Sequence, residues 1–470
     1  MTTPIEALRR ILPVTGWSGD ATPNVGFTGG LDPVVPTPFK VGVSGAATIA
    51  ASGMAAAHLW QMRTGRQQKV AVDVRQATAS MRSGTYMKLG DGELSHARNS
   101  IMGTYPTRDG RWSYLHCNFP NHRAAALKVL GVAEEDRAAV ARAVATWTAQ
   151  DLEEAIIANK GAGGMVRSAA EWKTHPQAAA IAALPLMEIE KIGDAPVEPL
   201  PKGDRPLSGI KVVDITRVLA GPTGARTLAE HGAEVMKITA AHLPNLGYQE
   251  WDTGHGKLSA QLDLRDPSQL ETLLGLIRQA DVFSQGYRPG TLGSRGLSPE
   301  ELAKLRPGIV YVSLSAFGHK GPWASRRGFD TVVQTVSGIT LRQGELVPGK
   351  EPGPQFYPLS AIDYCTGYLM AMGAMVALAR RAQQGGSWLV RISLAQVGKW
   401  LVDLGEVPEA SLKGVPAEFP AGELERWSMV TETPSGPLKH LRPAVQLSET
   451  PARWARPSVP LGYHRPVWPN

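Results

Sequence analysis

A single carboxylate opens a long apolar segment at residues 361–381, AIDYCTGYLMAMGAMVALARR, and that carboxylate is Asp363. At the start of a helix, a carboxylate lies at the positive end of the helix dipole and can accept backbone N–H bonds. Such a side chain either caps the helix or, beside an apolar pocket, attacks an activated acyl or phosphoryl centre as a nucleophile. Spacing alone leaves both interpretations open.

A second carboxylate, Asp330, occurs near the start of the segment GFDTVVQTVSGIT, and Gln334 follows it by one helical turn. An aspartate before a helix is commonly a cap. The other interpretation is that Asp330 lies near Asp363 in one site.

Two basic residues are candidates for phosphate binding. Arg288 follows an expected strand in QGYRPG, at the edge where open α/β sheets bind ligands. Lys257 lies among glycines in GHGKLS, and glycines permit close approach of a ligand to the backbone. The alternative for each residue is a charged side chain that binds no ligand. The eleven histidines show no metal-ligand spacing, so we assign no metal site.

Strand and helix patterns alternate along the region that contains these residues. Strands are expected at 210–216, 233–239, 280–285 and 308–316, and helices at 267–279 and 299–305. This alternation predicts an α/β fold with a Rossmann-like open parallel sheet. No G-x-G-x-x-G follows the first strand, so nothing specific indicates a nicotinamide cofactor.

A chain of 470 residues is expected to form two or three domains. The N-terminal region, 1–195, includes a smaller mixed α/β domain, and a Pro-rich linker follows at 196–208. The Rossmann-like core is expected at 209–400, and an extended tail rich in Pro and Trp at 401–470.

Residues 41–77 align without a gap on residues 361–397. Each stretch has a small apolar helix, a basic patch, a glycine and a strand, which predicts an internal duplication. Val43 occupies the position of Asp363 in the first copy, so only one copy carries the carboxylate. The six identical pairs are Ala51/Ala371, Gly53/Gly373, Ala57/Ala377, Gly65/Gly385, Val70/Val390 and Gln76/Gln396.

The composition of the chain indicates which kind of molecule it binds and in which cellular compartment it works. The net charge of +7 is not concentrated in a basic run, which favours anionic small molecules over nucleic acid. The two cysteines, Cys117 and Cys365, are far apart, as expected in a reducing cytoplasm. The N-terminus has no apolar stretch of signal-peptide length. The sixteen apolar residues at 364–379 are fewer than the roughly 18–20 that a bilayer requires, so we expect a buried core helix and no membrane partner.

Several motifs, in order, resemble the class III CoA-transferases, the family of formyl-CoA transferase and the carnitine CoA-transferases. They are VVDITRVLAGPTGARTLAEHGAEVMKI, GKLSAQLDLRDP, ADVFSQGYRPGTLGSRGLSPEELAKLRPGIVYVSLSAFGHKGP, GFDTVVQTVSGIT and DYCTGYLMAMGAMVALARR. The resemblance is strongest over 209–400, continues at 430–464, and extends to the N-terminal third out of order. It implies the class III CoA-transferase fold in a partially duplicated, rearranged chain.

The resemblance implies an enzyme that moves CoA from an acyl-CoA donor to a carboxylic acid acceptor through an aspartyl anhydride and thioester. Asp363 would be the nucleophile, with Asp330 as a second catalytic residue. Acyl-CoA would be a substrate, no cofactor would be tightly bound, and two chains would form an interlocked homodimer. The residues implied for CoA binding are Val218, Leu219, Ala220, Lys257, Tyr287, Arg288, Gly290 and Arg327.

Alternatives remain for function and for assembly. Thr239 stands where the family has Glu, which favours a weakly catalytic CoA-binding paralogue or a scaffold subunit. Related racemases use a His in the Gly-x-Asp stretch, and Phe329 at that position removes one acid/base partner from a racemase or isomerase. The duplicated N-terminal piece could also fill the place of a partner chain and leave a pseudo-dimeric monomer.

Overall fold

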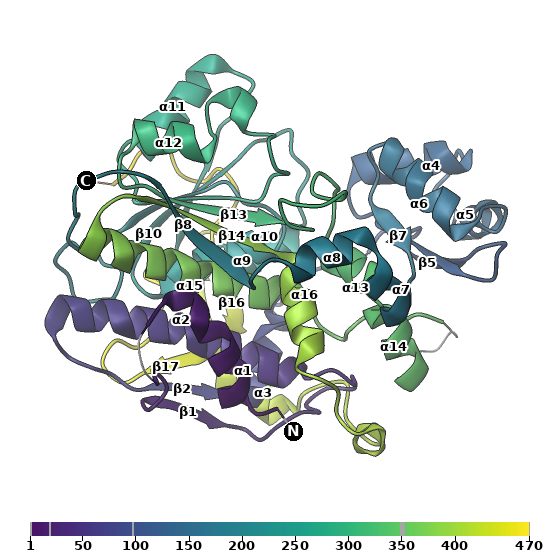
Figure 1. The fold of residues 1–470 in the computed structure, drawn as a ribbon, viewed down its shortest axis with the longest axis horizontal. Coiled ribbons are helices and arrows are strands. Elements are labelled where there is room, and N and C mark those ends of the chain that lie inside the picture. The colour runs from purple at the N-terminus through teal and green to yellow at the C-terminus, as the bar shows by residue number, and fades with distance from the viewer. Residues whose placement is uncertain (1, 18–19, 96–97, 348–352, 470) are drawn as a thin grey trace.

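The computed structural model of the protein describes residues 2–17, 20–95, 98–347 and 353–469. At its centre is a seven-stranded sheet in the order β11-β10-β9-β12-β13-β14-β8 (Figure 1). Six strands are parallel, and β8 pairs antiparallel with β14 at one edge. The strands are β8 (Met187–Gly193), β9 (Lys211–Asp214), β10 (Glu234–Thr239), β11 (Lys257–Gln261), β12 (Val282–Gln285), β13 (Val310–Ser315) and β14 (Ser387–Ser393).

The direction in which strands are added reverses between β9 and β12. From β9 the chain adds β10 and β11 toward one edge, and then β12, β13 and β14 toward the other. Doubly wound sheets bind ligands at such a reversal, outside the carboxyl ends of the two central strands. The predicted α/β fold with an open parallel sheet is therefore confirmed, and this crevice is where a site is expected.

Helices cover both faces of the sheet, because alternate residues of a strand point to opposite faces. Val213 and Phe283 pack into a core with α11 and α12, whereas Val212 and Val282 pack into the core on the other side. Figure 1 shows α11 and α12 above the sheet, and α15 and α2 below it. These helices are α2 (Val41–Thr64), α9 (Ala220–Glu230), α11 (Pro267–Ile277), α12 (Pro299–Leu305) and α15 (Ala361–Gln384).

The duplicated segments form two helices that pack against each other. Helices α2 and α15 each have 24 residues, and they begin at the aligned positions Val41 and Ala361. They lie along each other beneath the sheet (Figure 1). Each leads into a strand, β14 after α15 and β2 (Val70–Asp73) after α2. The predicted repeat of helix, turn and strand is thus present in the fold.

Glycines bring the start of α15 close to α9. A Cβ on Gly367 would lie 2.6 Å from the carbonyl oxygen of Ala220, and one on Gly224 would lie 3.0 Å from the carbonyl oxygen of Gly367. Any larger side chain at Gly367 would push the two backbones apart. The first turns of α15 are therefore held against the turn that follows β9, which places Asp363 at the strand reversal.

A small α/β unit lies to one side of the large sheet (Figure 1). It has a hydrophobic core of its own around Tyr105, Leu152 and Ile156. Its elements are β5 (Gly103–Pro106), β6 (Trp112–Leu115), β7 (Gly163–Met165), α4 (Pro120–Leu130), α5 (Arg137–Val144) and α6 (Ala149–Ala158).

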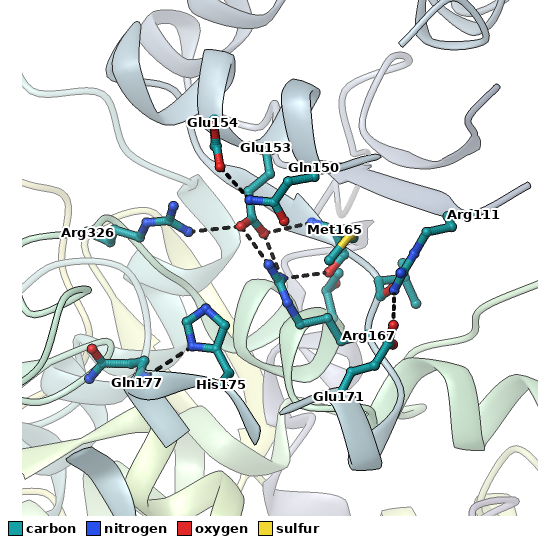
Figure 2. Close-up of polar contacts among 12 residues, drawn as sticks. Arg111, Gln150, Glu153, Glu154, Met165, Arg167, Glu171, His175, Gln177 and Arg326 are labelled. Carbon is teal, nitrogen blue, oxygen red and sulfur yellow. Dashed lines mark hydrogen bonds and ion pairs between the residues drawn. The ribbon is translucent and has the colours of Figure 1, made fainter. Parts of the chain in front are cut away.

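A buried carboxylate, Glu153 of α6, connects this unit to the main core (Figure 2). Both of its oxygens accept hydrogen bonds from Arg167 at 2.8 Å, and Oε1 also accepts one from Arg326 at 3.2 Å. Arg326 belongs to the loop before α13 (Asp330–Val336). Because a buried charge is costly unless it is paired, this network fixes the position of that loop.

The C-terminal tail runs back over the N-terminal region. Its strand β17 (Val445–Leu447) pairs with β2, which also pairs with β1 (Val25–Thr28). A second sheet combines tail strands β15 (Ser428–Thr433) and β16 (Gly436–Leu441) with β3 (Lys88–Leu89) and β4 (Gly92–Glu93). Trp468 is buried in the core beneath α11.

The remaining helices and short 3-10 turns connect these layers. The α-helices are α1 (Pro4–Ile11), α3 (Val74–Ser80), α7 (Ala169–Thr174), α8 (Pro176–Ala182), α10 (Gly247–Thr253), α14 (Ile339–Leu346), α16 (Leu394–Asp403) and α17 (Ala421–Trp427). The 3-10 turns are Leu12–Thr15, Ser83–Tyr86, Gly293–Arg295 and Glu409–Leu412.

Among the described residues, α15 alone is long and apolar enough to cross a membrane, and almost all of it is buried inside the protein. The prediction of a buried core helix at 364–379 is confirmed.

Candidate active site

Asp363 and Asp330 lie next to each other at the start of α15. Asp363 is the third residue of the helix and is 9% exposed. Its backbone N–H donates a hydrogen bond to Oδ2 of Asp330 at 2.9 Å, and the side chain of Gln334 donates to Oδ1. Asp330 therefore caps α15 from a neighbouring helix. The interpretation of Asp363 as the cap is wrong, because Ser360 holds that position and no side chain of α15 itself caps the helix.

Burial holds the pKa of both carboxyl groups above the ordinary range. Burial raises the pKa of Asp330 to about 6, although the hydrogen bonds from the Asp363 N–H and Gln334 oppose the rise. Burial raises the pKa of Asp363 well above its usual value, and the charge of Asp330 raises it further. Two carboxylates this close resist simultaneous ionisation. The Asp363 carboxylate is therefore poorly solvated, and it is reactive once it is ionised.

A pocket of about 490 Å³ opens at the strand reversal, and Asp363 lies in its wall. The turn after β9 supplies one side, and the loop after β12 supplies another. The loop before α13 and the start of α4 complete the wall. Asp363 is the one acidic residue among the described residues that line the pocket.

Four arginines line the same pocket: Arg217, Arg288, Arg326 and Arg327. Arg326 is paired with Glu153, whereas the ion pairs formed among the described residues include none of the other three. Burial lowers the pKa of Arg327, and the nearby charge of Arg288 lowers it further. Unpaired arginines that repel one another form a site for a multiply charged anion, because an anion relieves the repulsion and accepts charge-assisted hydrogen bonds.

Most residues expected to bind CoA line this pocket. Val218, Leu219 and Ala220 lie in the turn after β9, and Tyr287 and Arg288 lie in the loop after β12. Arg327 lies in the loop before α13. Gly290 does not line this pocket but an adjoining one, on the far side of Arg288 and Pro289.

Val218 has a φ of 72°, which is an outlier for a β-branched residue. Such strain costs free energy and persists where the surrounding structure fixes it, commonly at ligand sites. Here the strained residue forms the turn between β9 and α9, directly in the pocket wall.

Lys257 departs from its expected role. Its side chain is 1% exposed, and its Nζ donates hydrogen bonds to Oδ2 of Asp214 at 2.9 Å and to the carbonyl oxygen of Pro222 at 2.8 Å. Burial lowers the pKa of Lys257 to about 8, despite the attraction of Asp214. The ammonium group is used inside the protein and does not reach the pocket, so we remove Lys257 from the CoA site.

Three aromatic residues of the small unit, His116, Phe119 and His122, were not found by sequence reasoning. Phe329 stacks on His116 with ring centroids 3.9 Å apart, and His122 lies edge-on to Phe329 at 5.6 Å. His122 and Phe119 line the pocket. Burial lowers the pKa of His122 to about 4, so its imidazole is neutral near neutral pH. No local pattern could have found these histidines, because they come from the small unit.

The N-terminal copy retains part of the same arrangement. Asp32 caps α2 by accepting hydrogen bonds from the N–H groups of Gly42 at 2.9 Å and Val43 at 2.8 Å. This repeats the relationship of Asp330 to Asp363. The surrounding sequences are also similar, because GLDPVVPT at 30–37 aligns without a gap on GFDTVVQT at 328–335. The duplicate has therefore kept the capping carboxylate and lost the second one.

Known proteins share this sequence pattern. The family model of CoA-transferase family III matches residues 24–197 and 207–417. An acetyl-coenzyme A transferase of Hypoxylon pulicicidum is 32% identical over 328 residues, which are 65% of this chain and 55% of the relative. An acetyl-CoA:oxalate CoA-transferase of Acetobacter aceti is 35% identical over 205 residues, 41% of this chain and 51% of the relative.

The crystal structure of a hypothetical protein from Mycobacterium tuberculosis is 32% identical and covers 43% of this chain and 58% of its own, with a TM-score of 0.38. The chain spans about half the length of the curated relatives it matches. The family model nevertheless covers most of the chain on both sides of the Pro-rich stretch. The chain belongs to CoA-transferase family III.

Proposed function

We propose that this protein transfers CoA from an acyl-CoA donor to a carboxylic acid, with Asp363 as the nucleophile. One observation carries the proposal: a single buried carboxylate, Asp363, lies in a pocket whose other charged residues, among those described, are arginines. The arginines match the phosphates of CoA, and the carboxylate matches the thioester carbon. Family membership supports the same reaction.

The chemistry begins with attack of an Asp363 oxygen on the thioester carbonyl carbon. An O–C bond forms, the C–S bond breaks, and CoA leaves as a thiolate, which yields an acyl–aspartyl anhydride. The thiolate then attacks the aspartyl carbonyl and releases the donor acid, leaving CoA as a thioester on Asp363. An acceptor carboxylate attacks that thioester, which forms a second anhydride and releases the thiolate. The thiolate then attacks the acceptor carbonyl carbon, the C–O bond to Asp363 breaks, and acceptor-CoA and the free Asp363 carboxylate result. No oxidant or reductant is required.

Burial around Asp363 serves these intermediates. Anhydrides and thioesters hydrolyse when water reaches them, and the apolar helix α15 packed against α9 excludes water from one side. The raised pKa of Asp363 marks a carboxylate that water solvates poorly and that gains from forming a covalent bond. Asp330 acts as a positioning residue, since it holds the first turn of α15.

CoA binding is proposed for the turn at Val218, Leu219 and Ala220, and for Arg288 and Arg327, with Tyr287 beside them. Arg217 joins this set because it lies in the same wall and pairs with no carboxylate among the described residues. Gly290 contributes by shaping the turn after Arg288, where its φ is 79°.

Assembly and location are also proposals. The resemblance implies an interlocked homodimer, whereas the packing of α2 on α15 supports the pseudo-dimeric monomer, because the duplicate already covers α15 within one chain. Light scattering that gives a mass of 50.3 kDa supports the monomer, and twice that mass supports the dimer. A cytoplasmic location is supported by two free, buried cysteines.

Intact-protein mass spectrometry tests the transferase directly. Incubation with a panel of acyl-CoAs should add the mass of one acyl group, or of one CoA less water, to the wild-type chain. The Asp363→Asn variant should show neither adduct. Binding of acyl-CoA without any adduct and without transfer would instead support the scaffold alternative.

A further inference from the structure

A second pocket, of about 300 Å³, lies on the other side of the aspartate pair. Asp330 lines it, as do Tyr364, the residue after Asp363, and Ser360, the N-cap residue of α15, whereas Asp363 lines the first pocket. Leu219 lines both pockets. A ligand in the second pocket would therefore lie on the Asp330 side of the pair, whereas the arginine-lined pocket lies on the Asp363 side.

Three residues that line this second pocket carry buried polar atoms without hydrogen-bond partners among the described residues. The hydroxyl of Tyr357, Oε1 of Gln249 and Nε of Arg82 form no hydrogen bond among the described residues. Tyr357 is 6% exposed and Gln249 8% exposed, and all three side chains line the pocket. Buried polar groups are almost always satisfied in folded proteins, so such a cluster indicates a polar ligand.

One arginine of the pocket belongs to no ion pair among the described residues. Its acidic lining residues are Asp330 and Asp252, and Asp252 is already paired with Arg226 at 3.0 Å and accepts a hydrogen bond from Tyr364 at 2.9 Å. The basic lining residues are Arg82, which is paired with Glu418 at 2.9 Å, and Arg98. None of the ion pairs formed among the described residues includes Arg98, although its charge acts on Asp330 and Tyr248 across the pocket. Arg98 is thus the cation that remains for a ligand.

We propose that this second pocket holds the acceptor acid, with the guanidinium of Arg98 pairing with the acceptor carboxylate beside the thioester on Asp363. The inference rests on the proposed transferase function and adds the class of acceptor. The volume lies at the lower end of ligand pockets, which span roughly 300–1,000 Å³. Together with the polar lining, this size selects small, polar carboxylic acids over long-chain fatty acids.

The pocket accounts for the order of bond changes at Asp363. The acceptor oxygen attacks the thioester carbonyl from the Arg98 side, an O–C bond forms, and the C–S bond breaks. The thiolate leaves toward the arginine-lined pocket, where the rest of CoA is bound. Two openings allow donor and acceptor to reach one carboxylate without exchanging places.

The test compares Arg98→Met and Arg98→Lys with Arg108→Met, an arginine of the small unit that is matched in type and lies outside both pockets. Acceptor KM is measured with oxalate, succinate, glutarate and octanoate. Exchange of labelled CoA into acyl-CoA needs no acceptor, so it measures the donor half of the reaction alone. Binding of the same acids to the resting protein is followed by calorimetry.

Arg98→Met should raise the KM for the small dicarboxylates at least about tenfold, in line with loss of one charge-assisted contact, and leave CoA exchange unchanged. Lysine should restore part of the affinity, and Tyr357→Phe should raise the same KM by a smaller factor. Octanoate should be a poor acceptor throughout.

An unchanged KM in Arg98→Met, or an equal loss of CoA exchange, would overturn the inference. Absence of any adduct or exchange in the wild-type protein would overturn the transferase proposal instead. Calorimetry still decides the pocket in that case, because binding of oxalate or succinate must be lost in Arg98→Met and retained in Arg108→Met. Equal binding by the two variants counts against the pocket whatever the activity.

Discussion

The backbone N–H of Asp363 donates a hydrogen bond to Oδ2 of Asp330 at 2.9 Å, so one aspartate caps the helix that presents the other. A carboxylate used as a cap stays close to the second carboxylate and opposes its ionisation. The same contact that positions the proposed nucleophile therefore also sets its pKa. This relationship leads to separate predictions for pH dependence, stability and activity.

Asp330→Asn should shift the pH dependence of transfer toward acid. The reactive form of Asp363 is the carboxylate, and the charge of Asp330 raises the Asp363 pKa, so wild-type kcat/KM should rise with pH as Asp363 ionises. An asparagine oxygen can still accept the Asp363 N–H bond, but it carries no charge. The acidic limb of the kcat/KM profile should move to lower pH; no movement, or movement to higher pH, would contradict the assignment.

Asp363→Asn should make the folded protein more stable near neutral pH. A carboxyl group with a raised pKa binds protons more tightly in the folded state than in the unfolded state, so stability falls as pH rises from the unfolded pKa through the folded one. For Asp330 this window runs from about 4 to about 6, and for Asp363 it extends higher. Removing the charge should raise the free energy of unfolding by roughly 1 kcal/mol or more at pH 8, and by less at pH 5. Denaturant titration at the two pH values measures the difference.

Asp363→Ala should abolish transfer while the fold remains intact. Nucleophile removal costs roughly four or more orders of magnitude in other covalent enzymes. Val43→Ala is the matched control, because Val43 occupies the equivalent position in α2 and should leave activity near the wild-type rate. Circular dichroism and Tm confirm folding of both variants. A rate for Asp363→Ala that remains close to that of Val43→Ala would show that another residue attacks the thioester.

Arg288→Ala and Arg327→Ala should weaken acyl-CoA binding. Each would remove a charge-assisted phosphate contact worth roughly 1.5–3 kcal/mol, which raises the KM for acyl-CoA about tenfold or more. The effect should shrink with added salt, because the contacts are partly exposed to solvent. Wild-type KM values in both variants would exclude this wall of the pocket as the phosphate site.

Lys257→Met should lower stability rather than affinity. Lys257 pairs with Asp214 inside the protein, and its loss leaves a buried carboxylate without a partner. Breaking one side of a buried pair typically costs about 3–5 kcal/mol. The double variant Lys257→Met with Asp214→Asn should recover part of that loss. If the folded Lys257→Met protein instead shows a raised acyl-CoA KM with unchanged stability, the lysine does belong to the CoA site.

The sequence by itself determined the strands β9, β10, β12 and β13, the helices α11 and α12 and the long apolar helix with Asp363 at its start. These features depend on periodicity and turn residues within a few positions, and such local patterns survive in the fold. It also indicated the duplication, because α2 and α15 share their length and small-residue spacing. Sequence reasoning left open whether Asp330 lies near Asp363, and the hydrogen bond between them decides that it does.

Only the tertiary structure decided which charges are free. From the sequence, Lys257 and Arg288 are equally good candidates for phosphate binding. In the structure, Lys257 pairs with Asp214 in the core, whereas Arg288 lies in a pocket wall. The histidine stacked on Phe329, the cap that Asp32 provides for α2, and the pocket around Arg98 depend on segments that lie far apart in the chain. Contacts of this kind follow from how helices and sheets pack, which fixes burial and charge pairing, and no local pattern encodes that outcome.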